Sequence, residues 1–469
     1  MEELIENCLD YAEKLGADYV DIRGERYYDE FISVINGIVD KAFTVRKRGI
    51  GVRILLNGAW GFASVNSPTR ETSRRTIENA LGQARIIGQG HKKAVELAPI
   101  KVFEDRVETP RKIDLEDYAI DDKIDDTLEW ERGFRVSQEV KDTMLNYTGI
   151  KFDRIFMSSE GANLRFLNSV VWVEMKAGAI RGGTRGSFAL YHGGCGGYEI
   201  LKGGDIPALT SHVAEKAVSL IDAKHAPTIR NATIVFDPYY QAILTHEILG
   251  HPSEADRVLG REAASAGGAW WAGKLGERIG SKNLNVYDDP TIPGTMGYFL
   301  YDDEGVKARR KVLIQEGILK DHMHSRETAA EFGVEPNAGM RAMSFEYFPL
   351  IRMSNTFIGG GDWSPEEIVE ETKKGVYVST RKDNSIDDKR YNWTISAQEG
   401  WLIENGERTT HLKDVTVSGI APKLFESIDA VGRDMQIKPI IGCGKGMQMI
   451  YVGNGGPHMR GVADIIGGG

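Results

Sequence analysis

The sequence predicts an α+β protein of two domains, an N-terminal α+β domain (residues 1–225) and a mainly β C-terminal domain (residues 226–469). Three observations support this fold class. The chain has 469 residues, more than one hydrophobic core normally organises. Its first half mixes helical and strand-like patterns, whereas its second half is mostly strand-like. Between the halves, residues 224–231 contain Pro227 and no regular pattern, so we place the domain boundary there.

The first domain is predicted to begin with a helix over residues 2–15, where apolar residues recur at helical spacing. Strand-like runs then follow at residues 19–23, 30–36, 37–46 and 49–56. We interpret Gly49 and Gly51 as turn glycines, because no succession of strand, glycine loop and helix supports a nucleotide-binding loop there.

Two further helices are expected around residues 71–87 and 115–141, separated by an irregular connection that contains Pro99 and Pro110. A fourth helix near residues 208–221 is predicted to close the domain.

Between the last two of these helices, residues 147–189 alternate as strands do, with a hairpin turn at residues 158–161. His192 and Cys195 come next and have the spacing of a metal-ligand pair. A closed zinc site needs four ligands and no second pair is present, so the glycine-rich surroundings favour a flexible loop.

The second domain opens with a strand-like run at residues 232–236. Asp237 and Pro238 follow, an N-cap residue and a proline at the first helical position. The only other helix expected is at residues 365–374. Pro293-Gly294 predicts a turn, and the glycine runs at residues 359–361 and 467–469 predict loops.

Charge and cysteine content exclude several classes of protein. Acidic residues outnumber basic ones 68 to 58, which argues against non-specific nucleic-acid binding. The three cysteines are widely spaced and odd in number, as suits a reducing compartment. The N-terminal residues resemble an acidic amphipathic helix and not a signal peptide. No apolar stretch is long enough to span a membrane. We therefore expect a cytoplasmic protein without nucleic-acid or membrane partners.

The most informative segment is His246-Glu247-Ile248-Leu249-Gly250-His251, which places two imidazoles and a carboxylate within six residues. Such a set could hold a zinc ion and place a general base beside its bound water. However, residues five apart on a regular helix diverge by about 140°. A π-bulge, one extra residue in the turn, would restore a common face. Alternatively, Pro252 directly after His251 could end the helix there.

The alternative to a metal site is an ordinary helix whose histidines pack in the core or face solvent. Tyr239, Ile243 and Leu244 can supply the buried face of this helix, which leaves His246 and His251 without an obvious packing role.

A third zinc ligand is needed, and two candidates stand out. Glu254, or less well Asp256, lies just beyond the helix, although a solvated acidic residue is the commoner role. Cys443 lies among glycines after a strand-like run, where its sulfur would be accessible to a metal, although lone cysteines are more often inert and buried.

These residues resemble the TldD/PmbA family, and within it the TldD-type zinc metalloprotease subunit. Matching segments run in order along most of the chain: Tyr19–Ile22, Gly49–Arg53, His246–His251 with Glu254 and Asp256, Pro293–Thr295, Tyr301–Val306, Leu313–Leu319, Arg352–Thr356, Leu402–Gly406 and Cys443–Gly446. The tail from Val452 to Arg460 departs from the best-known bacterial pattern. The fold implied by the resemblance agrees with the two-domain organisation above.

The resemblance implies a zinc ion bound by His246, His251 and Cys443, with Glu247 as general base. It also implies unfolded or extended peptide substrates that enter a channel enclosed with a second subunit. That subunit would be another copy or a PmbA-type (TldE-type) partner. PmbA-type chains lack the histidine and cysteine set, which this chain retains.

Two other functions stay open. The chain could be a non-catalytic assembly subunit whose metal is structural or absent, or a zinc amidase acting on non-peptide amides. Candidate substrate-binding residues are Arg352 and Asn355, which hydrogen bonding within the fold explains equally well. His322 and His324 would share one side of a strand and could face the cleft, although an ordinary half-exposed strand is the favoured interpretation.

Overall fold

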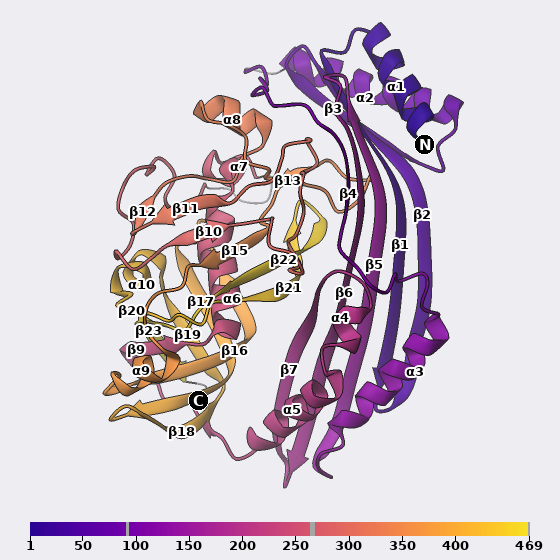
Figure 1. The fold of residues 1–469 in the computed structure, drawn as a ribbon. Coiled ribbons are helices and arrows are strands. Elements are labelled where there is room, and N and C mark those ends of the chain that lie inside the picture. Colours follow the sequence, from indigo (N-terminus) through magenta and orange to yellow (C-terminus); the bar gives the residue numbers. More distant parts are fainter. Residues whose placement is uncertain (91–92, 263–267, 468–469) are drawn as a thin grey trace.

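The computed structural model describes residues 1–90, 93–262 and 268–467, and its strands form separate sheets in the two halves of the chain (Figure 1). The strands up to Cys195 form one seven-stranded sheet. The strands from Lys224 onwards form an eight-stranded, a six-stranded and a two-stranded sheet. The predicted α+β class is confirmed, while the exact boundary at residue 225 stays a prediction.

The first sheet has the order β3-β2-β1-β5-β6-β4, and β7 pairs with a different part of β6 than β4 does. Its members are β1 (Tyr19–Ile35), β2 (Ile38–Leu56), β3 (Ala59–Asn66), β4 (Glu104–Glu108), β5 (Val140–Ser158), β6 (Asn163–Arg181) and β7 (Thr184–Cys195). All neighbours are antiparallel except β4 and β6. Among the described strands β7 pairs with β6 alone, so it is an edge strand facing the second half of the chain (Figure 1).

Helices cover the two ends of this sheet (Figure 1). They are α1 (Glu2–Lys14) and α2 (Arg70–Gly90) at one end, and α3 (Ile120–Glu131), α4 (Glu199–Lys202) and α5 (Ile206–Ser219) at the other. Apolar side chains of α1 and α2 form one buried core with β1 and β2, and those of α3 to α5 form a second. The helix predicted over residues 115–141 is therefore shorter than expected, and β5 begins within its predicted range.

The four short strands predicted between residues 19 and 56 are in fact two long ones, β1 and β2. The charged run Arg46-Lys47-Arg48 suggested a break, but there β2 pairs with β1 only and its outer edge faces solvent. Gly49 and Gly51 are not turn residues either. A Cβ at Gly49 would lie 2.0 Å from the Phe345 ring, so the glycines of β2 admit a loop from the second half of the chain.

The predicted loop at His192–Cys195 is also wrong, because these residues end β7. Their glycines mark tight strand packing and not flexibility, since a Cβ at Gly194 would lie 2.2 Å from the Gly294 carbonyl oxygen.

The eight-stranded sheet closes on itself through an additional pairing of β16 with β17. It contains β8 (Lys224–His225), β9 (Ile229–Phe236), β16 (Lys374–Ile386), β17 (Asn392–Glu404), β18 (Glu407–Lys413), β19 (Val415–Ile420), β20 (Ala430–Val431) and β23 (Met459–Gly467). Gly467 thus ends a strand where a loop was predicted, and residues 468–469 lie outside the described residues.

The six-stranded sheet has the order β12-β11-β10-β15-β22-β21. Its strands are β10 (Val286–Asp288), β11 (Lys311–Gln315), β12 (Ile318–Leu319), β15 (Asn355–Ile358), β21 (Gln436–Lys445) and β22 (Gln448–Gly456), while β13 (Met340–Arg341) and β14 (Leu350–Ile351) form the small sheet. The turn at Pro293-Gly294 and the loop at residues 359–361 are as predicted.

Helix α6 (Pro238–Thr245) lies between β16 of the closed sheet and β21 and β22 of the six-stranded sheet (Figure 1). Every α6 residue except the half-buried Tyr239 is buried. Besides α9 (Pro365–Glu370), which was predicted, this half contains α7 (Ala255–Val258), α8 (Arg326–Phe332) and α10 (Ala421–Ser427). These three are too short to give a clear helical period in the sequence.

Buried ion pairs join the two halves. The Arg53 guanidinium contacts Asp21 at 2.6 Å within its own sheet and Glu304 of the second half at 3.0 Å. Arg154 bridges Glu25 and Asp303 in the same manner, at 2.7 and 2.6 Å. Of the helices in the described ranges, none is both long and apolar enough to cross a bilayer.

Candidate metal centre

The helix that bears the histidine motif changes its winding at the motif. Asp237 caps α6 by accepting a 2.7 Å hydrogen bond from the Tyr240 amide, as predicted. Residues His246 to Gly250 then form a π-helical turn, and His251 to Ser253 a short 3₁₀ turn. The predicted π-bulge is therefore confirmed, and the alternative holds in part, because the π turn ends at Gly250 and Pro252 lies in the 3₁₀ turn that follows. The extra residue brings the two imidazole rings to 4.7 Å, edge to face.

Gly250 is required by packing at this turn. A Cβ on Gly250 would lie 2.0 Å from the Met353 sulfur. Its lack of a side chain therefore lets the π turn pack directly on the chain beside β15.

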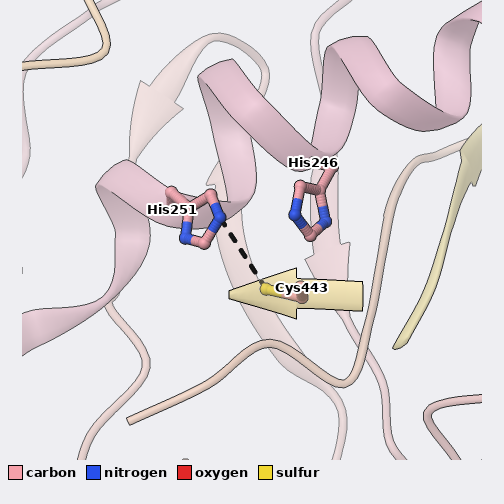
Figure 2. Close-up of side chains that lie close together, drawn as sticks. All are labelled: His246, His251 and Cys443. Atoms are coloured by element: carbon pink, nitrogen blue, oxygen red, sulfur yellow. Dashed lines mark hydrogen bonds between the residues drawn. The ribbon is translucent and has the colours of Figure 1, made fainter. Parts of the chain in front are cut away.

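The third side chain at this point is Cys443, which lies on β21 of the β21–β22 hairpin. A register shift between Ile440 and Cys443 re-aims the strand just before the cysteine. The Cys443 sulfur lies 3.8 Å from His251 Nε2, with His246 beside it (Figure 2). The candidate ligand atoms of His246, His251 and Cys443 all lie within 4.8 Å of one another, and all three residues are buried.

Hydrogen bonds to the other ring nitrogens orient both imidazoles. His246 Nδ1 lies 3.0 Å from Asn454 Oδ1, while the Asn454 amide nitrogen donates to the Thr356 carbonyl at 3.2 Å. His251 Nδ1 lies 3.1 Å from Glu254 Oε2. An ionised carboxylate and an amide oxygen only accept, so we assign the protons to Nδ1. The Nε2 lone pairs of both rings are thereby left for a metal.

Glu254, a candidate third ligand in the sequence, thus holds His251 from the far side of its ring. It is buried against Lys445, whose ammonium lies 3.2 Å from Glu254 Oε2, 2.8 Å from Asp256 and 3.0 Å from the Ile351 carbonyl. Burial alone would raise the pKa of Glu254, but Lys445 and His251 outweigh it and hold that pKa well below its usual range. Asp256 shares Lys445 and is also absent from the ligand cluster.

The charges at the site favour a cation. Burial would lower the pKa of His251, but Glu254 and Cys443 outweigh burial and raise it to about 9. Burial would likewise raise the pKa of Cys443, but His246 and His251 hold it well below its usual value. The metal-free site therefore pairs a thiolate with an imidazolium. A soft thiolate beside two imidazoles is a donor set that suits zinc, which would take the place of the proton.

Glu247 lies beside His246 on the π turn and accepts hydrogen bonds through both oxygens. Asn384 Nδ2 donates to Oε1 at 2.9 Å, and Arg390 forms an ion pair with Oε2. Burial would raise the pKa of Glu247, but the neighbouring His246, His251 and Arg390 lower it. The carboxylate is therefore ionised, as a proton acceptor must be.

Asn384 and Arg390 were not predicted. Asn384 lies near the end of β16 and Arg390 in the turn between β16 and β17, in a stretch where acidic, basic and amide residues follow one another as in an ordinary solvated loop. No periodic or spacing signal in the sequence relates that loop to the motif.

The predicted substrate-binding residues Arg352 and Asn355 make contacts within the fold. Arg352 is buried, and its Nη2 donates to the Cys443 carbonyl, so it supports the ligand strand. Asn355 accepts from the Gly297 amide at 3.1 Å and donates to the Asp289 carbonyl at 2.7 Å.

His322 and His324 lie apart from the ligand cluster. They flank Met323, whose backbone pairs with Ser253 and Ala255 next to the motif. Their ring centres lie 6.1 Å apart, but the predicted strand is not formed, because only Met323 between them makes an isolated β-bridge, with Glu254. Both are buried and not half-exposed, because they pack against Phe332 of α8.

Comparison with known proteins adds an independent finding. Residues 229–463 match the model of the PmbA/TldA metallopeptidase C-terminal domain, and residues 20–84 match that of PmbA/TldA metallopeptidase domain 1. A metalloprotease from Methanocaldococcus jannaschii is 33% identical over 449 residues, which covers 96% of this chain and 97% of that protein.

A zinc metalloprotease TldD homolog from Saccharolobus solfataricus is 27% identical over 454 residues, covering 96% of each protein. The crystal structure of TldE from Thermococcus kodakarensis superposes with a TM-score of 0.78 and 21% identity, and covers 99% of this chain and all of that one. At that identity the likeness is one of fold.

Proposed function

The chain belongs to the PmbA/TldD family of metallopeptidases, as its sequence resemblance predicted, and from this premise we propose that it is a zinc-dependent peptidase. The observation that carries the proposal is the convergence of His246, His251 and Cys443 beside the ionised carboxylate of Glu247. Structural zinc sites usually have four protein ligands, whereas catalytic sites keep one position open. Three ligands beside a base favour catalysis over the alternative of a non-catalytic assembly subunit.

In this proposal His246, His251 and Cys443 hold the zinc ion and Glu247 manages the proton. The bound zinc ion would lower the pKa of a water molecule at its open position and polarise the scissile carbonyl. Glu247 accepts the proton of the attacking water and delivers it to the leaving amine. Asn384 orients the carboxylate, and Arg390 keeps it ionised until the proton arrives.

Extended or unfolded peptides are the proposed substrates. The edge strand β7 contacts β21, the strand of Cys443, so a peptide beside β7 would lie near the ligands. The Gln398 side-chain amide pairs with both backbone groups of Ala189, at 2.7 and 2.8 Å, which supports hydrogen bonding of an amide-bearing ligand along this edge. Backbone pairing of this kind tolerates many sequences.

We also propose that the peptidase works as a dimer, with a second copy or a PmbA-type (TldE-type) subunit closing the channel. The similarity in fold to TldE supports such a pairing, because paired subunits of one fold commonly associate about a pseudo-twofold axis. Cys8, Cys195 and Cys443 are free thiols and buried, which supports a reducing compartment and thus the cytoplasm.

Zinc content and peptide cleavage, measured together, test the proposal. We expect about one zinc per chain, the count for one three-ligand site, and cleavage of an unfolded peptide by the chain alone or mixed with a PmbA-type subunit. Cys443→Ser should lose both. Zinc that is retained in Cys443→Ser, or a zinc-loaded pair without cleavage, would favour the assembly-subunit alternative. Cleavage of simple amides without cleavage of peptides would favour an amidase.

A further inference from the structure

A cavity of about 530 Å³ opens between the edge strand β7 and the second half of the chain. Its walls come from β7, α6, β16 and β21, among other elements. Two of its lining residues connect it to the metal centre, because Ala242 lies one helical turn before His246 and Ile440 lies three residues before Cys443. The volume is typical of cavities that hold small ligands or parts of larger ones.

The lining of this cavity is basic although the chain carries a net charge of −10. Six lysines and arginines line it against three acidic residues. The basic residues are Lys176, Arg185, Arg381, Lys382, Lys413 and Lys438, and the acidic ones are Glu174, Asp383 and Asp414. A concave wall of one sign focuses the field into the cavity and attracts ligands of the opposite sign.

Part of this charge is already neutralised. Asp414 contacts Lys382 at 3.7 Å and His225 at 3.1 Å, and Lys413 donates to the Leu220 and Ile221 carbonyls. Glu174, by contrast, accepts hydrogen bonds from the neutral side chains of Asn146 and Tyr191. It therefore neutralises the charge of no lysine by direct contact.

Besides Lys413, which contacts only carbonyl oxygens, four of the cations form no ion pair with any residue in the described ranges: Lys176, Arg185, Arg381 and Lys438. Aromatic rings hold two of them instead. The Lys438 ammonium lies 3.8 Å from the centre of the Tyr239 ring, and the Arg381 guanidinium 5.9 Å from that of Tyr191. A ring positions a cation without neutralising it, so both remain able to bind a carboxylate.

Arg381 also connects the cavity to the chemistry. It lies on β16 three residues before Asn384, whose amide donates to Glu247 at 2.9 Å. A ligand group bound by Arg381 would thus belong to the same peptide whose scissile bond reaches Glu247.

We propose that this cavity is a subsite for acidic side chains of the peptide, so that the enzyme selects substrates with Glu or Asp near the scissile bond. The inference rests on the proposed peptidase function, but measurements of peptide binding test it without any cleavage.

The test uses three dansyl-labelled peptides that differ only in carrying two Glu, two Gln or two Lys residues, bound to the zinc-loaded Glu247→Gln variant. We expect the Glu peptide to bind about three- to tenfold more tightly than the Gln peptide, as befits one or two partly exposed ion pairs, and the Lys peptide to bind most weakly. The preference should shrink in 0.5 M salt.

Matched charge removals identify the site. Lys438→Met with Arg381→Met should abolish the preference, and Lys438→Met alone should reduce it if the double variant folds poorly. Lys282→Met removes an exposed charge that does not line the cavity and should preserve it. Equal affinity for the Glu and Gln peptides, or a preference that survives loss of Lys438 and Arg381, would overturn the proposal.

Cleavage assays on the wild-type enzyme separate the two proposals. A Glu preference in binding without any cleavage would sink the peptidase function and keep the subsite. Cleavage of all three peptides with the same kcat/KM would keep the peptidase and refute the subsite.

Discussion

His246 and His251 form one buried pair of histidines, and His322 and His324 form another. Both pairs lie edge to face, with ring centres 4.7 and 6.1 Å apart. In the first pair each Nδ1 is bonded to an oxygen and each Nε2 is left for Cys443 and a metal. In the second, both nitrogens of His324 are occupied, by Thr328 at 3.1 Å and Asp321 at 3.4 Å.

The surroundings also move the pKa of one histidine in each pair, and the two shifts have opposite directions. Despite burial, Glu254 and the Cys443 thiolate raise the pKa of His251 to about 9. Burial and the neighbouring His324 lower that of His322 to about 4. Proximity of two histidines therefore says little about metal binding. A histidine pair can bind a metal when its free nitrogen lone pairs and a negatively charged ligand lie around the same position.

The largest expected difference between the pairs is in zinc content after one histidine of each is replaced. We expect His251→Ala to lose its zinc and all peptidase activity, because two ligands cannot hold the ion tightly. His324→Ala should keep about one zinc per chain, since His324 offers no ligand to the site. Metal analysis of the two purified variants measures this, and equal zinc loss in both would remove the distinction between the pairs.

The next effect concerns the carboxylate that only the first pair has beside it. Glu247→Gln should retain zinc, because Glu247 is no ligand, yet lower kcat by about 10²–10⁴-fold, the usual contribution of a general base. The glutamine amide remains a hydrogen-bond partner for Asn384, so the fold should persist. Full activity in a zinc-loaded Glu247→Gln variant would refute the assignment of the base.

The second pair should affect the free energy of unfolding at acidic pH. The folded protein binds a proton at His322 only near pH 4, whereas the unfolded chain binds it near pH 6.5. Stability is thus fully present above pH 6.5 and falls as the pH decreases from 6.5 to 4, by at most about 3 kcal/mol.

Urea unfolding of wild type and His322→Gln at several pH values isolates this contribution, because the other titrating groups are common to both proteins. The free energy of unfolding of the wild type should fall more steeply with acid. Parallel pH profiles for the two proteins would show that His322 is not the group responsible.

The smallest expected effect concerns the oxygen atoms that hydrogen-bond to the two histidine pairs. Glu254→Gln should weaken zinc binding about 10- to 100-fold, since it removes the charge behind His251 while keeping a possible acceptor. Thr328→Ala removes the oxygen beside His324 Nδ1 and should leave zinc affinity unchanged. Competition with a fluorescent zinc chelator measures both, and similar affinities in Glu254→Gln and wild type would contradict the role given to Glu254.

The parts that could be predicted from sequence are those that local chemistry decides. The Asp237 cap needs only its neighbours, and the π turn follows from the five-residue spacing of the two histidines. Cys443 lies 192 residues from His251, and no local pattern links a helix to a distant hairpin. Its glycine-rich setting made Cys443 a candidate, and the family resemblance paired it with the two histidines.

Other features could not be found in this way because tertiary contacts decide them. Arg390 reaches Glu247 from a turn that looks like any solvated loop. The glycines of β2 and β7 suggested turns and flexibility, but the structure uses them to bring backbone close to Phe345 and Gly294. A glycine in a sequence does not reveal what approaches it.

The ion pairs of Arg53 and Arg154 that join the two halves have a mechanical consequence. Separating the halves would strand Glu304 and Asp303, both buried, without their cations, at a cost of about 3–5 kcal/mol for each broken pair. Opening the cavity beside β7 by moving the two halves apart would therefore carry this cost. If the chain is a peptidase as proposed, we expect it to admit an extended chain and to exclude a folded domain without separating its two halves.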